Sequence, residues 1–368
     1  MPEHGKISVR QFMVLVTLYT IGSAILVIPS AIAAYAKQDA WIAAIVGVGA
    51  GLLLVWLYLA VGNLFPHMTL MELNEKLLGK WLGKTVSLLF TTTLFVSAPP
   101  FILFYLGNFM TTQILPQTPI QAINIFFAII VVMGMRLGLE TLARSAEILF
   151  PWFVLLFIGL VLFISPQIKL ENLSPVLGTG VKPLLPATLS FLSIAYLPLV
   201  VFLMIFPYVN QQQEARKAFF IGSLAGGLVM IIMIALAILV LGADITERQM
   251  YPSYALAKKI NVGNFLQRIE AIMAVMWFIS LYFKLTFYFY SAVVGFSQIF
   301  NLKDYRPLVL PFGMLLVVLS LIIVPNVVYG QTWDAKTWMP YSLTIGFLYP
   351  VLLLGVSACR KKRETEAR

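Results

Sequence analysis

Charged residues are scarce in this chain, and their scarcity excludes a soluble domain. They make up 11% of the 368 residues, whereas hydrophobic residues make up 60%. Soluble domains hold about 25% charged and about 45–50% apolar residues, so a soluble fold of this size could not bury so much apolar surface. The few charges gather between apolar runs of about 20 residues, the length that crosses a bilayer as a helix. The composition therefore predicts an all-α integral membrane protein with several spans.

Cysteine and histidine are also rare, and this limits the possible chemistry. The single cysteine, Cys359, excludes an intrachain disulfide, and the two histidines, His4 and His67, are too few for a metal cluster. The sequence also has no Gly-rich phosphate loop and no nucleophile-and-base motif. We therefore expect that the protein is not an enzyme and that it holds no cofactor and no metal.

Ten apolar runs are predicted to span the membrane in a single transmembrane domain that covers residues 1–368. The loops between them are too short for a separate soluble domain. The fourth run is short, and the eighth is long with polar residues in its middle. The predicted spans cover residues 11–34, 41–64, 84–107, 119–135, 147–165, 184–207, 218–242, 269–299, 307–325 and 337–358.

Lysine and arginine are unevenly shared between the two sides of these spans. Their excess gives a net charge of +10, but they border apolar runs, so we expect no nucleic-acid partner. The two tails and the even-numbered loops hold about twice as many of them as the other loops, which places both termini in the cytoplasm. Residues 359–368 form a basic cytoplasmic tail that could touch anionic headgroups, so membrane lipid is an expected partner.

Two loops carry helix patterns of their own. Residues 68–80, MTLMELNEKLLGK, are predicted to form a short amphipathic helix between the second and third spans. Residues 244–268, which include PSYALAKK, are a second candidate on the opposite side. For both segments we favour a plain surface helix over a binding site.

The first span contains an interruption within YTIGSAILVIPSA, residues 19–31. Gly22, Ser23 and Ala24 are small, and Pro29 removes a backbone donor, so together they allow the helix to unwind. Freed backbone groups are tolerated in a membrane only where protein or a water-filled cavity receives them. Many transporter folds bind their substrate at such a break, although a patch of small residues can also serve close helix packing alone.

The sixth span contains a matching segment, SFLSIAYLP. Ser190 precedes Pro198 by eight residues, much as Gly22 precedes Pro29 by seven. If ten spans are two inverted repeats of five, the first span pairs with the sixth, and a matched pair of interrupted spans indicates a ligand site. The repeats would cover about 11–165 and 184–358. The predicted ligand contacts at the two breaks are Gly22, Ser23, Ala24, Ser190, Phe191, Ser193 and Tyr196, with Pro29 and Pro198 as helix-breaking residues.

Aromatic residues in two other spans are further candidates. Tyr288 lies on the face of the eighth span that also holds Lys284, and an aromatic stripe of this kind serves packing more often than a pocket. Tyr105 lies late in the third span and is either a pocket residue or an anchor at the membrane interface. Glu140, Arg144 and Glu147 at the start of the fifth span are expected to form a structural charge cluster.

Several segments resemble one known family, and the resemblance covers essentially the whole chain. The segments are GKISVRQF, IGSAILVIPSA, AKQDAWIA, ELNEKLLGKWLGK and FLMIFPYVNQ. They are similar to the B subunits of the nutrient germinant receptors of bacterial endospores, which belong to the amino acid–polyamine–organocation superfamily. IGSAILVIP resembles that superfamily's G-[small]-[small]-I-x(3)-P break. The resemblance implies the LeuT-type fold of five plus five spans, with the first and sixth spans broken.

The resemblance also implies a function. Such subunits lie in the inner spore membrane, bind a small nutrient that is often an amino acid, and trigger germination together with an A subunit, which is a membrane protein, and a C subunit, which is a lipoprotein. They sense their ligand rather than pump it. Many members carry Gly-Glu shortly before the Phe of the sixth span, where this chain has Leu197-Pro198 before Phe202. The resemblance therefore implies no glutamate contact to the ligand at this position.

Lys284 is the only charge clearly central in a span. A cation at mid-bilayer costs at least about 2.5–3.5 kcal/mol on insertion scales, so its side chain should face the bundle interior. In the LeuT-type fold the first and eighth spans flank a sodium site, so Lys284 could replace that ion and brace the first break. Two other roles stay open, which are pairing with a ligand carboxylate and bonding to carbonyls for structure alone.

A proton- or ion-coupled amino-acid permease of the same fold is the alternative function. Permeases usually need a titratable relay within the membrane. The middles of the first, sixth and eighth spans hold no aspartate or glutamate, which disfavours carboxylate-based coupling, although Lys284 could replace it. A third possible function is a passive path for ions or water that the partner opens.

Overall fold

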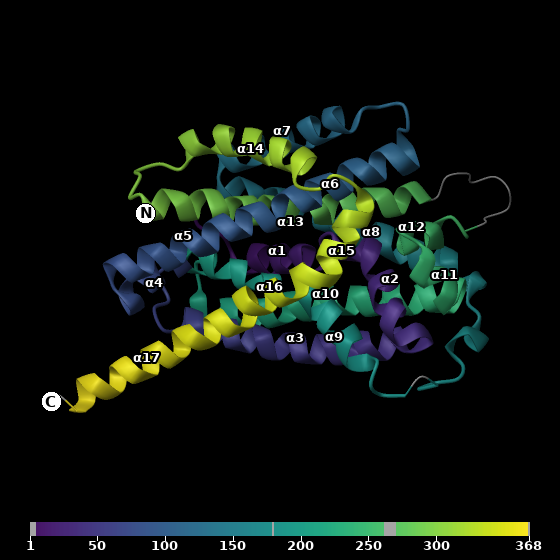
Figure 1. Ribbon diagram of the computed structural model, residues 1–368, viewed down its shortest axis with the longest axis horizontal. Coiled ribbons are helices and arrows are strands. Elements are labelled where there is room, and N and C mark those ends of the chain that lie inside the picture. The colour runs from purple at the N-terminus through teal and green to yellow at the C-terminus, as the bar shows by residue number, and fades with distance from the viewer. Residues whose placement is uncertain (1–4, 179, 261–269, 367–368) are drawn as a thin grey trace.

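The computed structural model describes residues 5–178, 180–260 and 270–366, which form an elongated bundle of helices with no regular strand among them (Figure 1). Eight segments of these residues are long and apolar enough to cross a membrane, as expected for a membrane protein. They are Ala24–Gly62 (α2 Ala24–Ala36, η1 Lys37–Asp39 and α3 Ala40–Gly62), Lys80–Ile114 (α5 Lys80–Ser97, α6 Pro99–Phe109 and η2 Met110–Ile114), Ile120–Leu137 (α7), Leu139–Gln167 (α8 Leu139–Ile164 and η3 Ser165–Gln167), Leu184–Met204 (α9 Leu184–Ala195 and η5 Leu197–Met204), Gln212–Leu241 (α10), Glu270–Ile299 (α13) and Val327–Arg360 (α15 Val327–Trp333 to α17 Tyr349–Glu366).

Two shorter apolar helices, α1 (Val9–Ile21) and α14 (Arg306–Ile322), accompany these segments. The segment Ala24–Gly62 joins the second half of the first predicted span to most of the second, because only the short turn η1 separates α2 from α3. The helical class is therefore as predicted, and the count of ten spans stays a prediction.

The outer faces of the bundle are apolar. On α8, Leu155 and Leu162 are 62% and 64% exposed, and on α3 Leu53 and Trp56 are exposed in the same way. Apolar patches of this extent would be unfavourable in water, and they fit contact with lipid chains. α1 is different, since most of its side chains are buried within the bundle.

Small residues let α1 pack closely on α10. A Cβ atom added to Gly222 would lie 2.6 Å from the carbonyl oxygen of Met13, and one added to Gly226 would lie 2.7 Å from Cβ of Thr20. Close approach through small residues stabilises helix pairs in membranes, where lipid removes the hydrophobic drive between helices. This packing holds α1 in the middle of the bundle.

The loop between α3 and α5 contains α4 (Leu70–Leu78), which confirms the short helix predicted over residues 68–80. Its start is fixed by a capping box, in which the Thr69 hydroxyl accepts from the N–H of Glu72 and the Glu72 carboxylate accepts from the N–H of Thr69. It ends at Gly79, whose φ of +86° favours glycine. Leu73 and Leu77 are buried on its inner face.

The predicted helix within residues 244–268 is instead two short helices, α11 (Ala243–Arg248) and α12 (Pro252–Ala257). Residues 261–269 of this prediction lie outside the described residues. The predicted tail, residues 359–368, continues α17 as helix as far as Glu366. Residues 367–368, and the side chains from Lys361 onward, lie outside the description.

Both ends of the chain lie at the end of the bundle that carries α4, and α11 and α12 lie at the opposite end (Figure 1). We call these the α4 end and the α11 end. At the α4 end the chain before α1 pairs with the segment after η5, since the N–H of Ile7 donates to the carbonyl of Tyr208 at 3.0 Å and the N–H of Asn210 donates to the carbonyl of Ile7 at 3.0 Å. The first turn of α1 is thereby held in place.

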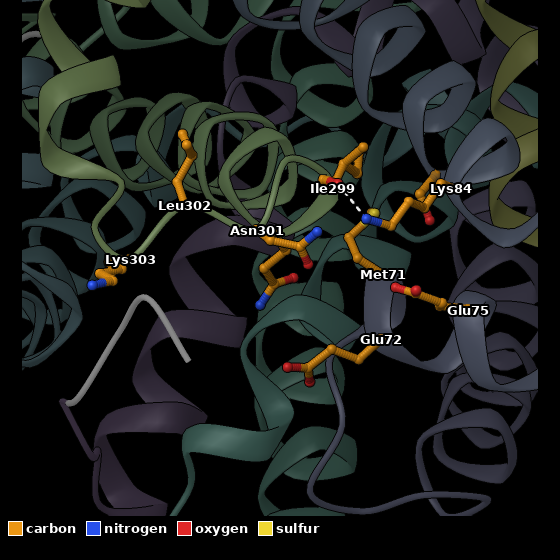
Figure 2. Close-up of a pocket in the computed structure, with 10 residues that line it drawn as sticks. Met71, Glu72, Glu75, Lys84, Ile299, Asn301, Leu302 and Lys303 are labelled. Atoms are coloured by element: carbon orange, nitrogen blue, oxygen red, sulfur yellow. Dashed lines mark hydrogen bonds between the residues drawn. The ribbon is translucent and has the colours of Figure 1, made fainter. Parts of the chain in front are cut away.

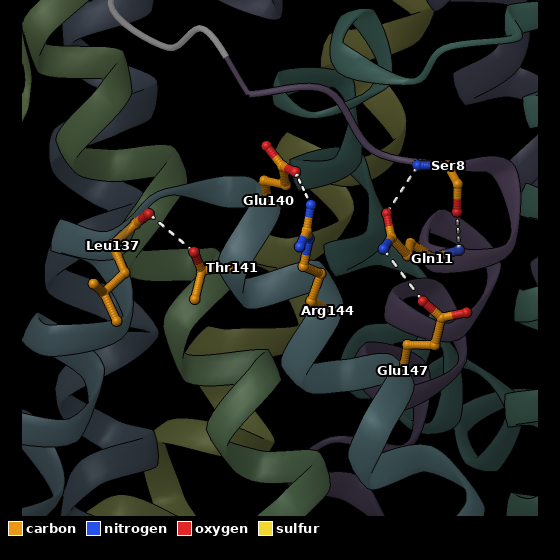
Figure 3. Close-up of polar contacts among 7 residues, drawn as sticks. All are labelled: Ser8, Gln11, Leu137, Glu140, Thr141, Arg144 and Glu147. Atoms are coloured by element: carbon orange, nitrogen blue, oxygen red, sulfur yellow. Dashed lines mark hydrogen bonds and ion pairs between the residues drawn. The ribbon is translucent and has the colours of Figure 1, made fainter.

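One ion pair and one hydrogen bond join α1 to α8 at the same end, and Figure 3 shows the hydrogen bond from Gln11 to Glu147. Arg144 pairs with Glu140 at 2.5 Å, one helical turn apart, as predicted. Glu147 does not join that pair. It faces α1, where its carboxylate lies 3.4 Å from Nε of Arg10 and accepts from Nε2 of Gln11 at 3.2 Å. The predicted three-residue cluster is therefore two separate contacts.

Candidate ligand-binding site

The helical path of the first span is interrupted between α1 and α2. Gly22 ends α1 with φ at +37°, and Ser23 separates it from Ala24, the first residue of α2. A Cβ atom on Gly22 would lie 2.1 Å from Cδ of Lys284 and 2.8 Å from the carbonyl oxygen of Tyr19. Glycine is therefore required here for its backbone angle and for the approach of Lys284.

Side chains of α13 satisfy the carbonyls at this interruption. Ser280 Oγ donates to the carbonyl of Gly22 at 2.9 Å, and Trp277 Nε1 donates to the carbonyl of Ser23 at 3.4 Å. These side chains supply the hydrogen-bond donors that lipid cannot supply. Backbone carbonyls without a donor are costly in an apolar medium unless protein groups bond to them.

Pro29 lies inside α2, which continues through it. A proline has no N–H, so the carbonyl four residues earlier, that of Ile25, loses its helical donor. Ser253 of α12 replaces that donor, since its hydroxyl donates to the Ile25 carbonyl at 2.6 Å. The interruption itself is at Gly22 and Ser23, and Pro29 changes the hydrogen bonding of α2 without ending it.

The sixth predicted span changes from the α-helix α9 to the 3₁₀ helix η5 around Tyr196. Pro198, the second residue of η5, removes the donor for the carbonyl of Ile194. Lys284 replaces it, because its Nζ donates to that carbonyl at 2.7 Å. Lys284 is 1% exposed, and it contacts the interruption of the first span through Gly22. One side chain of α13 thus connects both interrupted segments.

Two aromatic residues of the sixth predicted span, Phe191 of α9 and Tyr196 directly after it, face α3 and α10. A Cβ atom on Gly47 of α3 would lie 2.5 Å from the Phe191 ring, and one on Gly51 would lie 2.3 Å from the Tyr196 ring. The Tyr196 hydroxyl donates to the carbonyl of Ser223 on α10 at 2.8 Å. These two rings therefore pack between α9, α3 and α10.

A cavity of about 70 Å³, which we call the central cavity, lies between the two interrupted segments. Ser23, Lys284 and Tyr288 contribute polar groups to its wall. Asp334 joins them from η7 (Asp334–Trp338), a π-helical stretch of the last apolar segment. Such stretches often mark functional positions in helices. The remaining lining residues are Val27, Ser97, Ala98, Phe101, Ile102, Tyr105, Ile194, Trp277 and Trp338.

A larger cavity of about 430 Å³, which we call the vestibule, adjoins the central cavity and includes residues of α11. Both cavities are lined by Tyr105 and Asp334, and the Tyr105 hydroxyl donates to the Asp334 carboxylate at 2.6 Å. This hydrogen bond lies where the two spaces meet. Glu247 lines the vestibule and pairs with Lys37.

The sequence candidates divide between these walls. Ser23, Tyr105 and Tyr288 line the central cavity, and Ser190, Ser193 and Tyr105 line the vestibule. Gly22, Ala24, Phe191 and Tyr196 are in neither lining. The ligand contacts assigned to these residues stay predictions.

Asp334 is the residue that sequence reasoning missed. The last predicted span began at residue 337, because Asp334 and Lys336 lower the local hydropathy and read as a loop. The helix begins ten residues earlier, at Val327. An isolated acid close to a long apolar run was the available signal.

A third cavity, of about 330 Å³, lies at the α4 end between α4, α5 and the end of α13 (Figure 2). Two of its charged groups already have structural roles. Glu72 caps α4, and Lys84 Nζ donates to the carbonyl of Ile299 at 2.9 Å, at the C-terminus of α13 (Figure 2). It lies away from both interrupted segments, so we do not place the ligand there.

Comparison with known proteins identifies the family. Residues 6–328 match the family described as Spore germination protein. The chain belongs to this family. Among curated members it is 32% identical to Spore germination protein KB of Bacillus subtilis, over 100% of this chain and 98% of that protein. It is 27% identical to Spore germination protein YndE of the same organism, over 98% of each chain.

Solved structures show which fold this member of the family has. The transporter Mhp1, of the nucleobase-cation-symport-1 family and closed around bromovinylhydantoin, superposes with a TM-score of 0.69 at 11% identity, over 92% of this chain and 76% of that one. MhsT in complex with L-phenylalanine gives a TM-score of 0.64 at 13% identity, over 94% and 97%. This spore germination protein therefore has the LeuT-type transporter fold.

Proposed function

We propose that this protein is the ligand-sensing subunit of a spore germinant receptor. It binds a small nutrient, expected to be an amino acid, in the central cavity between the interrupted first and sixth spans. The observation that carries the proposal is the central cavity itself, walled by Ser23 at one interruption, by Ile194 at the other, and by Lys284 between them. The signal passes to an A subunit in the membrane and a lipoprotein C subunit.

The proposed topology has ten crossings in two inverted repeats, about 11–165 and 184–358. The crossings are α1 with α2, α3, α5 with α6, α7, α8, α9 with η5, α10, α13, α14 and α15 to α17. We place the protein in the inner spore membrane with both termini on the spore-core side. The excess of lysine and arginine in the tails and even-numbered loops supports this orientation.

Sensing needs two states that bind the ligand with different affinity. The contacts at the two ends of the bundle support one of these states. The vestibule leads from the α11 end to the Tyr105–Asp334 hydrogen bond, whereas Glu147 and the Ile7–Tyr208 bond tie down α1 at the α4 end. We propose that the ligand enters from the α11 end and changes how α1 is held at the other.

Of the three roles open for Lys284, its geometry best supports that of a brace. Its hydrogen bond to Ile194 replaces the donor that Pro198 lacks, and its aliphatic part packs on Gly22. Its side chain reaches from the eighth predicted span to Gly22 of the first, where a bound ion would otherwise hold the break.

Filling the central cavity tests the proposed function. Ala98 lines the cavity and is 3% exposed, so Ala98→Leu should raise the nutrient concentration for half-maximal germination at least tenfold in spores that carry the variant gene. Gly49→Ala is the matched control, because its new Cβ would meet nothing within 4 Å. An unchanged concentration dependence for Ala98→Leu, at a normal amount of protein, would contradict the proposed site.

An amino-acid permease coupled to protons or ions is the second candidate, favoured by the transporter fold shared with Mhp1 and MhsT. Uptake of labelled amino acids into proteoliposomes that hold only this chain separates the two. We expect no concentrative uptake. Robust uptake by the isolated chain would overturn the sensor and favour the permease.

A further inference from the structure

Two ionisable side chains of opposite type line the central cavity without pairing with each other. Lys284 comes from α13 and Asp334 from η7. In the part of the chain that the structure describes, ion pairs within 4.0 Å join Arg10 with Glu147, Lys37 with Glu247, and Arg144 with Glu140. The small central cavity lies between the two unpaired side chains.

Each of these side chains has hydrogen-bonding capacity to spare. An ammonium group has three donors, and Lys284 uses one on the carbonyl of Ile194. A carboxylate accepts about four hydrogen bonds, and Asp334 accepts one from Tyr105. Holding such groups away from water is costly unless opposite charges and hydrogen bonds compensate. A ligand with both charges would compensate the two together.

Ser97 is a third polar group on the same wall. Ser97 is 7% exposed, and its hydroxyl has no hydrogen-bond partner within 3.5 Å among the described residues. Tyr341, whose hydroxyl is near Ser97, donates instead to Thr93 at 3.2 Å. A buried hydroxyl without a partner is uncommon in native structures and calls for a specific reason. A polar ligand atom in the central cavity would give it one.

The rest of the wall, apart from Ser23, Tyr105 and Tyr288, is apolar. Trp277 and Trp338 have N–H groups, but both are used on backbone carbonyls, of Ser23 at 3.4 Å and of Ser193 at 3.0 Å. Phe101 adds a ring that stacks on Trp333. A cavity of about 70 Å³ with such walls fits a ligand with a short, apolar remainder.

We propose that Asp334 binds the ammonium group of a small zwitterionic ligand whose carboxylate faces Lys284. Ser97 contributes a further hydrogen bond, and Tyr105 positions Asp334 through its hydroxyl. The ligand class is an α-amino acid with a short apolar side chain. This inference rests on the proposed function, which places a small nutrient in the central cavity, and it adds which residues recognise the two ends of the molecule.

Thermal stabilisation of the purified full-length chain in detergent tests the inference. The probes are L-alanine and L-valine, propionate and isovalerate, which lack the amino group, the corresponding amino-acid amides, which lack the carboxylate, and glucose, which has no charge. We expect L-alanine or L-valine to raise the unfolding temperature and the other probes to leave it unchanged.

Asp334→Asn should raise the amino-acid concentration for half-maximal stabilisation at least tenfold. Because asparagine can still accept from Tyr105, the unfolding temperature without ligand should stay as in the wild type. Asp244→Asn is the matched control, since the exposed Asp244 lines neither the central cavity nor the vestibule, and this variant should bind amino acids normally.

Two outcomes would overturn the inference and leave the proposed function standing. One is stabilisation by an amino acid that Ala98→Leu abolishes and Asp334→Asn does not change. The other is stabilisation by glucose, and not by the amino acids, that Ala98→Leu abolishes. A third outcome would also overturn the inference. It is that no probe stabilises the purified chain, although spores that carry the same gene germinate normally in response to an amino acid.

Discussion

The two interrupted segments differ in how the carbonyl freed by their proline is satisfied. In α2, Pro29 leaves the Ile25 carbonyl without a helical donor, and the neutral hydroxyl of Ser253 donates to it at 2.6 Å. At the start of η5, Pro198 does the same to Ile194, and the amine of Lys284 donates at 2.7 Å. A serine hydroxyl has one proton to give, whereas an ammonium has three.

In each segment a side chain replaces the backbone donor that the proline lacks, and we call this replacement a repair. The difference matters because the two repairs lie in different places. Ser253 is buried and is not among the residues of the central cavity, so its bond completes a helix and does nothing more. Lys284 lines the central cavity, so the group that repairs the second segment can also meet a ligand. Structural repair and recognition are thus separate at Pro29 and combined at Pro198.

Gly22→Ala should have the largest effect, because the interruption of the first segment depends on both the backbone angle and the space at Gly22. A Cβ at φ +37° would lie 2.1 Å from Cδ of Lys284. We expect a loss of at least about 3 kcal/mol of stability, combining backbone strain and overpacking. The thermal unfolding of the purified chain measures it, with Gly49→Ala as control. A variant with wild-type stability would refute the assigned role of Gly22.

A double-mutant cycle between Pro198 and Lys284 tests the second repair. Lys284→Met leaves the Ile194 carbonyl without a donor, at a cost of about 1–3 kcal/mol. Pro198→Ala restores a backbone N–H, so the two changes together should cost about 1–2 kcal/mol less than their sum. Strictly additive unfolding free energies would show that Lys284 does not replace the proline's missing donor.

The interrupted segments and α4 could be predicted from the sequence, whereas the directions of two aromatic rings could not, and the difference has a physical cause. Gly22 and Pro198 indicated the interrupted segments, and the amphipathic pattern of residues 68–80 indicated α4, because these signals are local. The direction of the Phe191 and Tyr196 rings depends on glycines of α3, more than a hundred residues away in the chain. No local pattern in α9 carries that information.

Asp334 shows a second limit. Hydropathy treats an acid near an apolar run as the start of a loop, since a charge in lipid is costly. Asp334 avoids that cost by facing the two cavities and accepting a hydrogen bond from Tyr105. Its place in the site depends on the hydrogen bond from Tyr105 of α6, a contact between distant parts of the chain that only the tertiary structure displays.

Ser253→Ala should have a smaller effect than the loss of the Lys284 bond. It leaves the Ile25 carbonyl without its donor, and we expect a loss of about 1–2 kcal/mol. In a Pro29→Ala background, where the backbone N–H returns, the same change should cost less. Because Ser253 does not line the central cavity, the concentration dependence of germination should stay unchanged once protein amounts are matched. A shifted concentration dependence would mean that the first repair also takes part in recognition.

Ser280→Ala should have the smallest effect. Its hydroxyl lies 2.9 Å from the Gly22 carbonyl and 3.2 Å from the Trp277 carbonyl, so one proton is shared between two acceptors. Trp277 also supports the same interruption through Ser23. We therefore expect a loss of about 0.5–1 kcal/mol in thermal unfolding. A loss as large as that of Gly22→Ala would show that the hydrogen bonds from α13, and not the glycine, maintain the interruption of the first segment. Side chains of α13 would then stabilise both interrupted segments, and the contrast between the two repairs would have to include them.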